Sequence, residues 1–108
     1  MSLPVRGEVW LVDLGMVAKV RPALVVSVPF GDRDYALFHI VPHTTVPHGS
    51  QFEVVAKVPW LQPGAFNVQG SQSIAHARFV RKLGALNDQQ LVSIERAFKR
   101  WVGLSPAL

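Results

Sequence analysis

Two places in this sequence set polar, phosphate-binding side chains at the ends of apolar runs. Arg21 precedes the run Pro22-Ala23-Leu24-Val25-Val26, and Thr44 and Thr45 follow a second run that ends near Val41. A guanidinium stays protonated at every relevant pH, and its fork of donors fits phosphate oxygens. A threonine hydroxyl can donate to another oxygen of the same phosphate. We therefore expect rigid strands to hold Arg21 and a threonine across one cleft.

Cleavage of RNA without a metal needs few groups beyond these, because the 2′-hydroxyl of the substrate is itself the nucleophile. The protein must accept the proton of that hydroxyl and stabilise charge on the phosphorane, and the departing 5′-oxygen must gain a proton. Arg21 suits charge stabilisation, whereas an unperturbed threonine hydroxyl is not a general base. His43, beside the threonines, is a candidate acid or base, and His48 is a weaker one. The alternative is that these histidines only solvate a loop.

Other residues have the types that bind single-stranded RNA, which is held by cations along its backbone and by stacking or hydrogen bonding at its bases. Each also has a structural alternative, since exposed cations often only solubilise a protein and Trp60, beside Pro59, more often covers a core. The predicted RNA-binding residues are Lys19, Lys57, Gln69, Gln72, Ser73 and Arg78, with Arg81 and Trp60 as candidates by type.

The composition limits the architecture and the chemistry. A chain of 108 residues, 49% of them hydrophobic, is long enough for one core, so residues 1–108 are predicted to form a single domain. There is no cysteine, which excludes disulfides, a thiolate nucleophile and cysteine-bound zinc. The four histidines lack the helical i, i+4 pairing or the clustered carboxylates of a metal centre. We therefore expect neither a metal nor a cofactor.

The charge and the hydropathy pattern suggest a partner and a compartment. A net charge of +4 favours polyanions such as nucleic acid, although many small soluble proteins are mildly basic. No run approaches the roughly 18 apolar residues of a membrane span, and the N-terminus has no signal-peptide pattern. A soluble, cytoplasmic protein without a membrane partner is the expectation.

Short β-strands separated by turn residues account for most of the chain. The run 23–28 is almost continuously apolar and is predicted to be a strand buried on both faces. Gly31-Asp32-Arg33-Asp34 indicates a hairpin turn, residues 43–51 indicate a surface loop, and Gly70 suggests a bulge or a close backbone approach. The predicted strands are residues 6–14, 23–28, 35–41, 52–55, 65–74 and 78–83.

A helix over residues 88–102 has the clearest local signals. Asn87 is a good N-cap, Gln90 occupies the reciprocal capping position, and Gly103 provides the stop. The apolar residues expected to pack on the strands are Leu91, Ile94, Ala97, Phe98, Trp101 and Val102, leaving Arg96, Lys99 and Arg100 in water. Many strands followed by one helix indicate a mostly β or α+β domain.

Arg6-Gly7-Glu8-Val9-Trp10, Arg21-Pro22, the threonine pair and Gln72-Ser73-Ile74 together carry a family resemblance. From about Val5 to Leu104, the chain resembles the MazF/PemK toxin endoribonucleases of type II toxin-antitoxin systems. The resemblance implies an SH3-like β-barrel with a C-terminal helix, usually homodimeric. It also implies metal-independent, sequence-selective cleavage of single-stranded RNA, chiefly mRNA, which leaves a 2′,3′-cyclic phosphate and arrests translation and growth. A cognate antitoxin with an acidic, flexible segment would cover the cleft.

Within that resemblance, Arg21 matches the arginine of the arginine-proline motif, and Thr44 or Thr45 matches the motif threonine. The chain departs from its relatives at two acidic positions. The segment Met16 to Val20 contains no acid, and Gln69 stands where some relatives have aspartate. Two alternatives therefore stay open, which are a toxin that poisons gyrase as CcdB does on the same barrel, and a non-catalytic nucleic-acid-binding domain.

Overall fold

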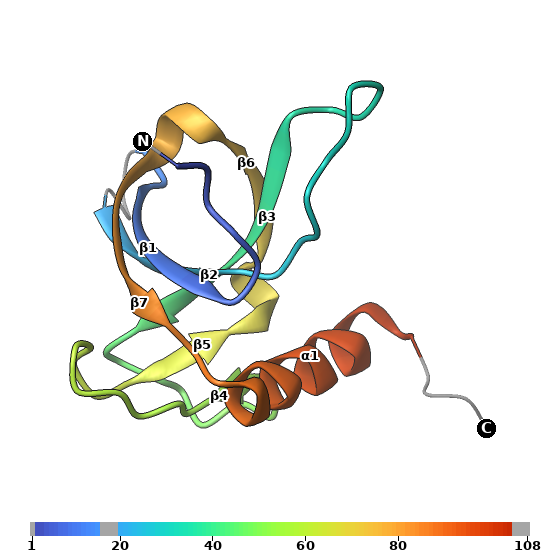
Figure 1. Ribbon diagram of the computed structural model, residues 1–108. Helices are drawn as coiled ribbons and strands as arrows, with labels where there is room; N and C mark the ends of the chain where they lie inside the picture. The colour runs from blue at the N-terminus through green and yellow to red at the C-terminus, as the bar shows by residue number, and fades with distance from the viewer. Residues whose placement is uncertain (1, 16–19, 105–108) are drawn as a thin grey trace.

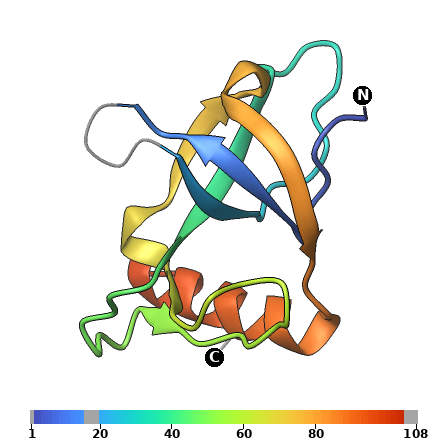
Figure 2. The same cartoon turned by 90° about the vertical axis from the view of Figure 1, so that its left-hand side faces the viewer.

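Seven short strands form one strongly curved antiparallel sheet, and a single long helix follows them (Figure 1 and Figure 2). The structure is a computed structural model that describes residues 2–15 and 20–104. Two 3-10 turns, η1 (Val68–Gly70) and η2 (His76–Arg78), interrupt the last strands. The main elements are β1 (Glu8–Asp13), β2 (Val20–Val25), β3 (Leu37–Thr44), β4 (Glu53–Val54), β5 (Ala65–Asn67), β6 (Gln72–Ala75), β7 (Phe79–Ala85) and α1 (Asp88–Val102).

Strand β3 organises the sheet because it pairs with three different strands along its length. The strand order is β4-β5-β3-β2-β1-β7, and β6 pairs with the beginning of β3. The middle of β3 pairs with β2, and its last two residues, His43 and Thr44, pair with β5. In the described part of the chain, no pairing joins β7 to β4 or β6, so the curved sheet stays open. The predicted α+β class with a C-terminal helix is confirmed, and the barrel is incomplete.

The sheet buries both of its faces, which explains the continuous apolar run in β2. Leu24 packs with Phe66 and Ile94 in a cluster between the sheet and α1. Its neighbours Ala23 and Val25 pack in a second cluster inside the curve of the sheet. Successive side chains of a strand point to opposite faces, so a strand with both faces covered must be apolar throughout. The expectation of burial on both faces is confirmed for these three residues.

Two strand predictions were wrong in their limits. β2 ends at Val25, and Val28 is 70% exposed. The predicted hairpin is confirmed, because β2 and β3 pair antiparallel and the Asp34 N–H donates to the Gly31 carbonyl at 3.1 Å, although its connection is long and spans residues 26–36. The predicted strand 65–74 is divided by η1, where Gly70 approaches the Pro42 side chain: an added Cβ would lie 3.0 Å from its Cγ. The close approach is therefore observed, without a bulge.

Helix α1 begins and ends where its capping residues predict. The Asn87 side chain accepts from the Gln90 backbone, the Gln90 side chain accepts from the Asn87 backbone, and Gly103 closes the helix at φ 77°. Ile94 and Ala97 are fully buried against the sheet. The expectation of a buried last turn was wrong for Trp101 and Val102, which are 43% and 46% exposed, because that turn extends beyond the sheet (Figure 1). Among the described residues, no helix has the length and apolar character needed to cross a membrane.

Candidate active site

A pocket of about 550 Å³ opens where β2 and β3 diverge, and we call it the arginine pocket. The β2–β3 pairing runs from Val25↔Ile40 to Ala23↔Pro42, and the same register continued by two residues sets Arg21 level with Thr44. Beyond this point β3 pairs with β5. The residues that line the arginine pocket are Leu11, Val20, Arg21, Pro22, His43, Thr44, Thr45, Val46, Trp60, Leu61, Gln62, Arg81 and Leu83.

Arg21 supplies a strong anion-binding group to this pocket. The residue is half-buried, and its Nε atom is fully buried with no hydrogen-bond partner among the described residues. A buried donor without a partner is destabilising, and such a group in a native structure calls for a ligand or a functional explanation. Arg81 also lines the pocket, and no carboxylate does so among the described residues. The pocket is therefore electrostatically suited to a phosphate.

The two threonines, which the sequence could not distinguish, differ in their surroundings. Thr44 ends β3 and is half-buried, and its Oγ1 accepts a hydrogen bond of 3.1 Å from the Val46 backbone N–H. That bond fixes the hydroxyl oxygen and leaves its proton free to be donated to a ligand. Thr45 is exposed and forms part of the pocket rim. Thr44 is therefore the better-positioned hydroxyl.

His43 lies inside the fold and not on a surface loop. Its side chain is only 5% exposed, and its ring packs edge-on against Phe66 with centroids 5.0 Å apart. The predicted loop 43–51 was wrong at this end, because β3 continues to Thr44 and the loop begins at Thr45. Burial lowers the pKa of His43 below its ordinary value of 6.5, since an apolar environment disfavours the charged imidazolium. A neutral imidazole, which can accept a proton, therefore lines the pocket at neutral pH.

Gly64 allows β3 and β5 to approach at the pocket floor. A Cβ atom added to Gly64 would lie 2.0 Å from the Thr44 carbonyl oxygen and 2.7 Å from His43 Cε1. A larger residue at position 64 would clash with the Thr44 backbone and with the His43 ring at once. The glycine therefore keeps His43 and Thr44 in register with the start of β5.

The segment 59–64, which belongs to none of the predicted strands, supplies one wall of the pocket. Trp60, Leu61 and Gln62 all line it. Trp60 lies directly over the Gly84 backbone, where an added Cβ would be 2.5 Å from the indole, and it packs on the core next to α1. The structural interpretation of Trp60 is thus supported. The sequence of the segment 59–64 gave no signal that the segment would lie close to Arg21, because that proximity depends on contacts between residues far apart in the chain.

The predicted RNA-binding residues do not gather in one place. Lys19 lies outside the described residues. Lys57 lines a second pocket next to the arginine pocket. The others line neither of these pockets: Gln69 lies in η1, Gln72 and Ser73 lie in β6, and Arg78 lies in η2. Ser73 Oγ is 2.9 Å from His39 Nδ1, so its hydroxyl is engaged within the sheet.

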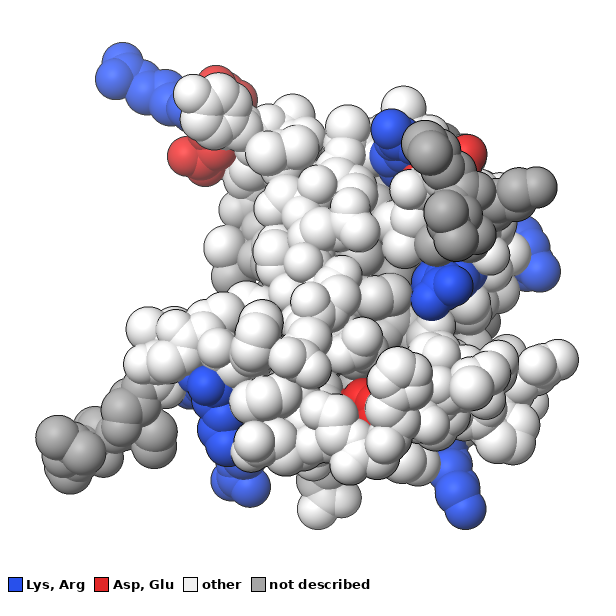
Figure 3. Space-filling view, turned by 180° about the vertical axis from the view of Figure 1, so that it is seen from behind, with Lys and Arg blue, Asp and Glu red and all other residues white. Residues whose placement is uncertain are grey.

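The charges of the described surface do not by themselves indicate the site. Lys and Arg side chains on the face seen in Figure 3 are scattered, with wide uncharged areas between them. In the described part of the chain, no group of three or more histidine, aspartate or glutamate side chains could hold a metal ion. Arg21, Arg81 and Thr44 line one pocket, and this local arrangement is more informative about a candidate anion site than the net charge is.

Comparison with known proteins shows the family of this chain. The model of one protein family, described as PemK-like, MazF-like toxin of type II toxin-antitoxin system, matches residues 5–102. The chain belongs to this family. It is also 32% identical over 106 residues to the probable endoribonuclease MazF5 of Mycobacterium tuberculosis, an alignment that covers 86% of this chain and 87% of that relative.

Solved structures show the same fold. A mycobacterial endoribonuclease in complex with its cognate antitoxin superimposes with a TM-score of 0.82 at 24% identity, covering 96% of this chain and 99% of that one. The toxin MazF-mt6 of Mycobacterium tuberculosis gives 0.79 at 23% identity, covering 92% and 99%. The resemblance to the MazF/PemK family expected from the sequence motifs is confirmed, and Arg21 and Thr44, which carried it, line one pocket.

Proposed function

We propose that this protein is the toxin of a type II toxin-antitoxin system and acts as a metal-independent endoribonuclease on single-stranded RNA, chiefly mRNA. Its family membership and its relation to a probable endoribonuclease support the activity. The observation that carries the proposal is that Arg21, whose buried Nε has no hydrogen-bond partner within residues 2–15 and 20–104, lines one pocket with Thr44. Cutting of mRNA would inhibit translation and growth.

The proposed reaction is an internal transesterification. The 2′-oxygen of one nucleotide loses its proton and bonds to the adjacent phosphorus, and the bond from phosphorus to the 5′-oxygen breaks. The products are a 2′,3′-cyclic phosphate and a free 5′-hydroxyl. Arg21 stabilises the extra negative charge on the phosphorane, and the Thr44 hydroxyl donates to a non-bridging oxygen. Because both groups are held by the sheet before substrate binds, little reorganisation is needed.

His43 is the residue we assign as proton acceptor. It lines the pocket, and its lowered pKa keeps it neutral at neutral pH. A positioned base of this kind contributes about 10²–10⁴-fold to a rate. No second histidine and no carboxylate is among the described residues that line the pocket, so we assign water as the source of the proton for the leaving oxygen. His43 thereby takes the place of the acidic residues that some relatives carry.

Partners and compartment follow from the same proposal. A relative of this fold is known in complex with its cognate antitoxin. An acidic, flexible antitoxin segment would suit this pocket, because the charged side chains that line it in the described part of the chain are Arg21 and Arg81. We further propose that the protein acts as a homodimer in the cytoplasm, where its RNA substrates are found.

The decisive experiment incubates the purified protein with a long RNA in EDTA. Wild-type protein should fragment the RNA, and Arg21→Ala should reduce the rate by at least about 10²-fold, as for loss of one preorganised transition-state donor. Arg33→Ala is the matched control, because Arg33 is exposed and lies outside the pocket. Intact RNA that is still bound would favour the non-catalytic alternative, and gyrase inhibition without RNA cleavage would favour a CcdB-like poison. None of the relatives named above is described as a gyrase poison.

A further inference from the structure

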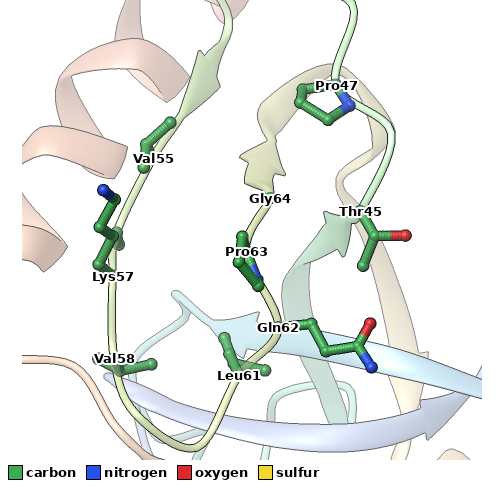
Figure 4. Close-up of a pocket in the computed structure, with 10 residues that line it drawn as sticks. Thr45, Pro47, Val55, Lys57, Val58, Leu61, Gln62, Pro63 and Gly64 are labelled. Atoms are coloured by element: carbon green, nitrogen blue, oxygen red, sulfur yellow. The ribbon is translucent and has the colours of Figure 1, made fainter.

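A second pocket of about 550 Å³ adjoins the arginine pocket and is not explained by the phosphate chemistry (Figure 4). The two pockets share three lining residues, Thr45, Leu61 and Gln62, so they lie next to each other. We call the second one the side pocket. Its remaining walls are formed by Pro47, by residues 55–58 and by residues 63–64.

The chemistry of the side pocket differs from that of its neighbour. Val55, Ala56, Val58 and Pro63 give it a largely apolar lining, and Lys57 is its only ionisable side chain among the described residues. Figure 4 shows the Gln62 side chain extending from the segment 61–64 toward the side where Thr45 lies. An apolar cavity of this size with a few polar groups at one side is typical of a site for a small, flat, polar-edged ligand.

The wall of the side pocket is fixed before any ligand binds. The Gln90 side-chain amide, at the start of α1, donates a hydrogen bond of 3.2 Å to the Lys57 carbonyl. The Leu61 N–H donates to the Val58 carbonyl at 3.3 Å and closes the turn between the two wall segments. On the opposite side, the contact of Gly64 with the Thr44 carbonyl ties the side pocket to the end of β3. The distance between the two pockets is therefore set by the fold.

We propose that the side pocket binds the base of a nucleotide next to the scissile phosphate and thereby selects the sequence that is cut. This inference rests on the proposed endoribonuclease function. The bases of single-stranded RNA can be turned out of the chain, packed against apolar surfaces and read at their edges by amides and hydroxyls. A base fits because the side pocket lies next to the pocket that Arg21 lines, and the amide of Gln62 and the hydroxyl of Thr45 belong to the lining of both pockets.

The test uses Val55→Trp, which fills the side pocket from a position that does not line the arginine pocket. Val55 is 63% exposed, so the substitution should leave the fold intact. Val28→Trp is the matched control, because Val28 is also an exposed valine, at 70%, and lines neither pocket. Mapping fragment 5′ ends on a long transcript first gives the nucleotides preferred by the wild-type protein around the cut.

Oligonucleotides with that preferred sequence are then made with a single abasic site at each position in turn. For wild-type protein and Val28→Trp, one abasic site next to the cut should lower kcat/KM by about tenfold, because the apolar burial of one base in the side pocket is lost. For Val55→Trp, the same abasic site should have no further effect, and the base preference at that position should disappear from the transcript map. Val55→Phe provides a smaller filling side chain if the tryptophan variant does not fold.

The failure of this inference and the failure of the proposed function give different results. If wild-type protein cuts no RNA, the proposed function fails. If it cuts RNA but Val55→Trp keeps the wild-type base preference and the wild-type response to every abasic site, the base-binding role of the side pocket is wrong. Loss of antitoxin binding or of self-association in Val55→Trp, with an unchanged cleavage pattern, would assign the side pocket to a protein partner and overturn the inference.

Discussion

Gly64→Ala is the substitution that most sharply tests the geometry of the pocket floor. The new Cβ would lie 2.0 Å from the Thr44 carbonyl oxygen and 2.7 Å from His43 Cε1, both well inside contact distance. The first neighbour is backbone, which cannot move aside as the end of a flexible side chain can. The strands must therefore separate by about 1 Å or more, where β3 pairs with β5 through His43↔Phe66 and Thr44↔Ala65.

The expected cost has a structural part and a functional part. Overpacking a tight site costs about 1–3 kcal/mol, and we expect the upper end because backbone is displaced. A loss of about 3 kcal/mol lowers the Tm of a domain of this size by about 10 °C or more. Displacing catalytic groups by about 1 Å can cost about 10²-fold in rate, so RNA cleavage should fall by that factor even at temperatures where the variant is folded.

Thermal unfolding and single-turnover RNA cleavage measure the two parts separately. Gly31→Ala is the control, because its added Cβ would lie 3.6 Å from the Asp34 side chain, an ordinary contact, and should change the free energy of unfolding by less than about 1 kcal/mol. If Gly64→Ala were as stable and as active as Gly31→Ala, the close approach of β3 and β5 would not constrain the site, and the reasoning would be refuted.

Three further predictions concern charge, protonation and capping. Arg21→Lys should recover little of the activity lost in Arg21→Ala, because an ammonium lacks the planar fork of donors, and cleavage rates would show this. In a pH–rate profile, the cleavage rate should rise with pH up to the lowered pKa of His43, below 6.5, and then level off. The variant His48→Gln should keep that profile, and His43→Gln should lose it. Asn87→Ala should lower the free energy of unfolding by about 1 kcal/mol in denaturant titration, because the α1 capping box is lost.

The stability of the fold should depend on the same histidine. Burial gives His43 a lower pKa in the folded state than its ordinary 6.5. Between the folded-state pKa and 6.5, the unfolded chain therefore binds more protons than the folded protein does. The contribution of neutral His43 to the free energy of unfolding is therefore complete above pH 6.5 and is lost as the pH falls through the folded-state pKa. His39, whose pKa is also lowered by burial, adds to the same trend.

Local signals in the sequence predicted the elements whose causes are local. The limits of α1 follow from Asn87, Gln90 and Gly103, whose hydrogen bonds and backbone angle act within one turn. The burial of β2 on both faces follows from its unbroken apolar run. Arg21 could be paired in advance with Thr44 or Thr45, because each motif stands at the end of such a run, and the β2–β3 register continued by two residues brings Thr44 level with Arg21.

Features that depend on distant contacts could not be predicted in this way. The burial of His43 results from β5 pairing with the end of β3, and a polar tract with Pro47 and Gly49 gave no sign of it. The wall formed by Trp60 to Gln62 depends on Gly84, more than twenty residues later, which leaves room for the indole. Ser73 was selected for its type, but its hydroxyl pairs with His39, a partner that only the β3–β6 register brings near.

The central claim is that Arg21 and Thr44 act together on one phosphate. It is tested most directly by single-turnover cleavage of a defined RNA in EDTA by wild-type protein, Arg21→Ala, Thr44→Ala and the double variant. We predict large losses for both single variants and, for the double variant, a loss clearly smaller than the product of the two, since groups that act as a unit are not additive. Cleavage by Arg21→Ala at the wild-type rate would contradict the account.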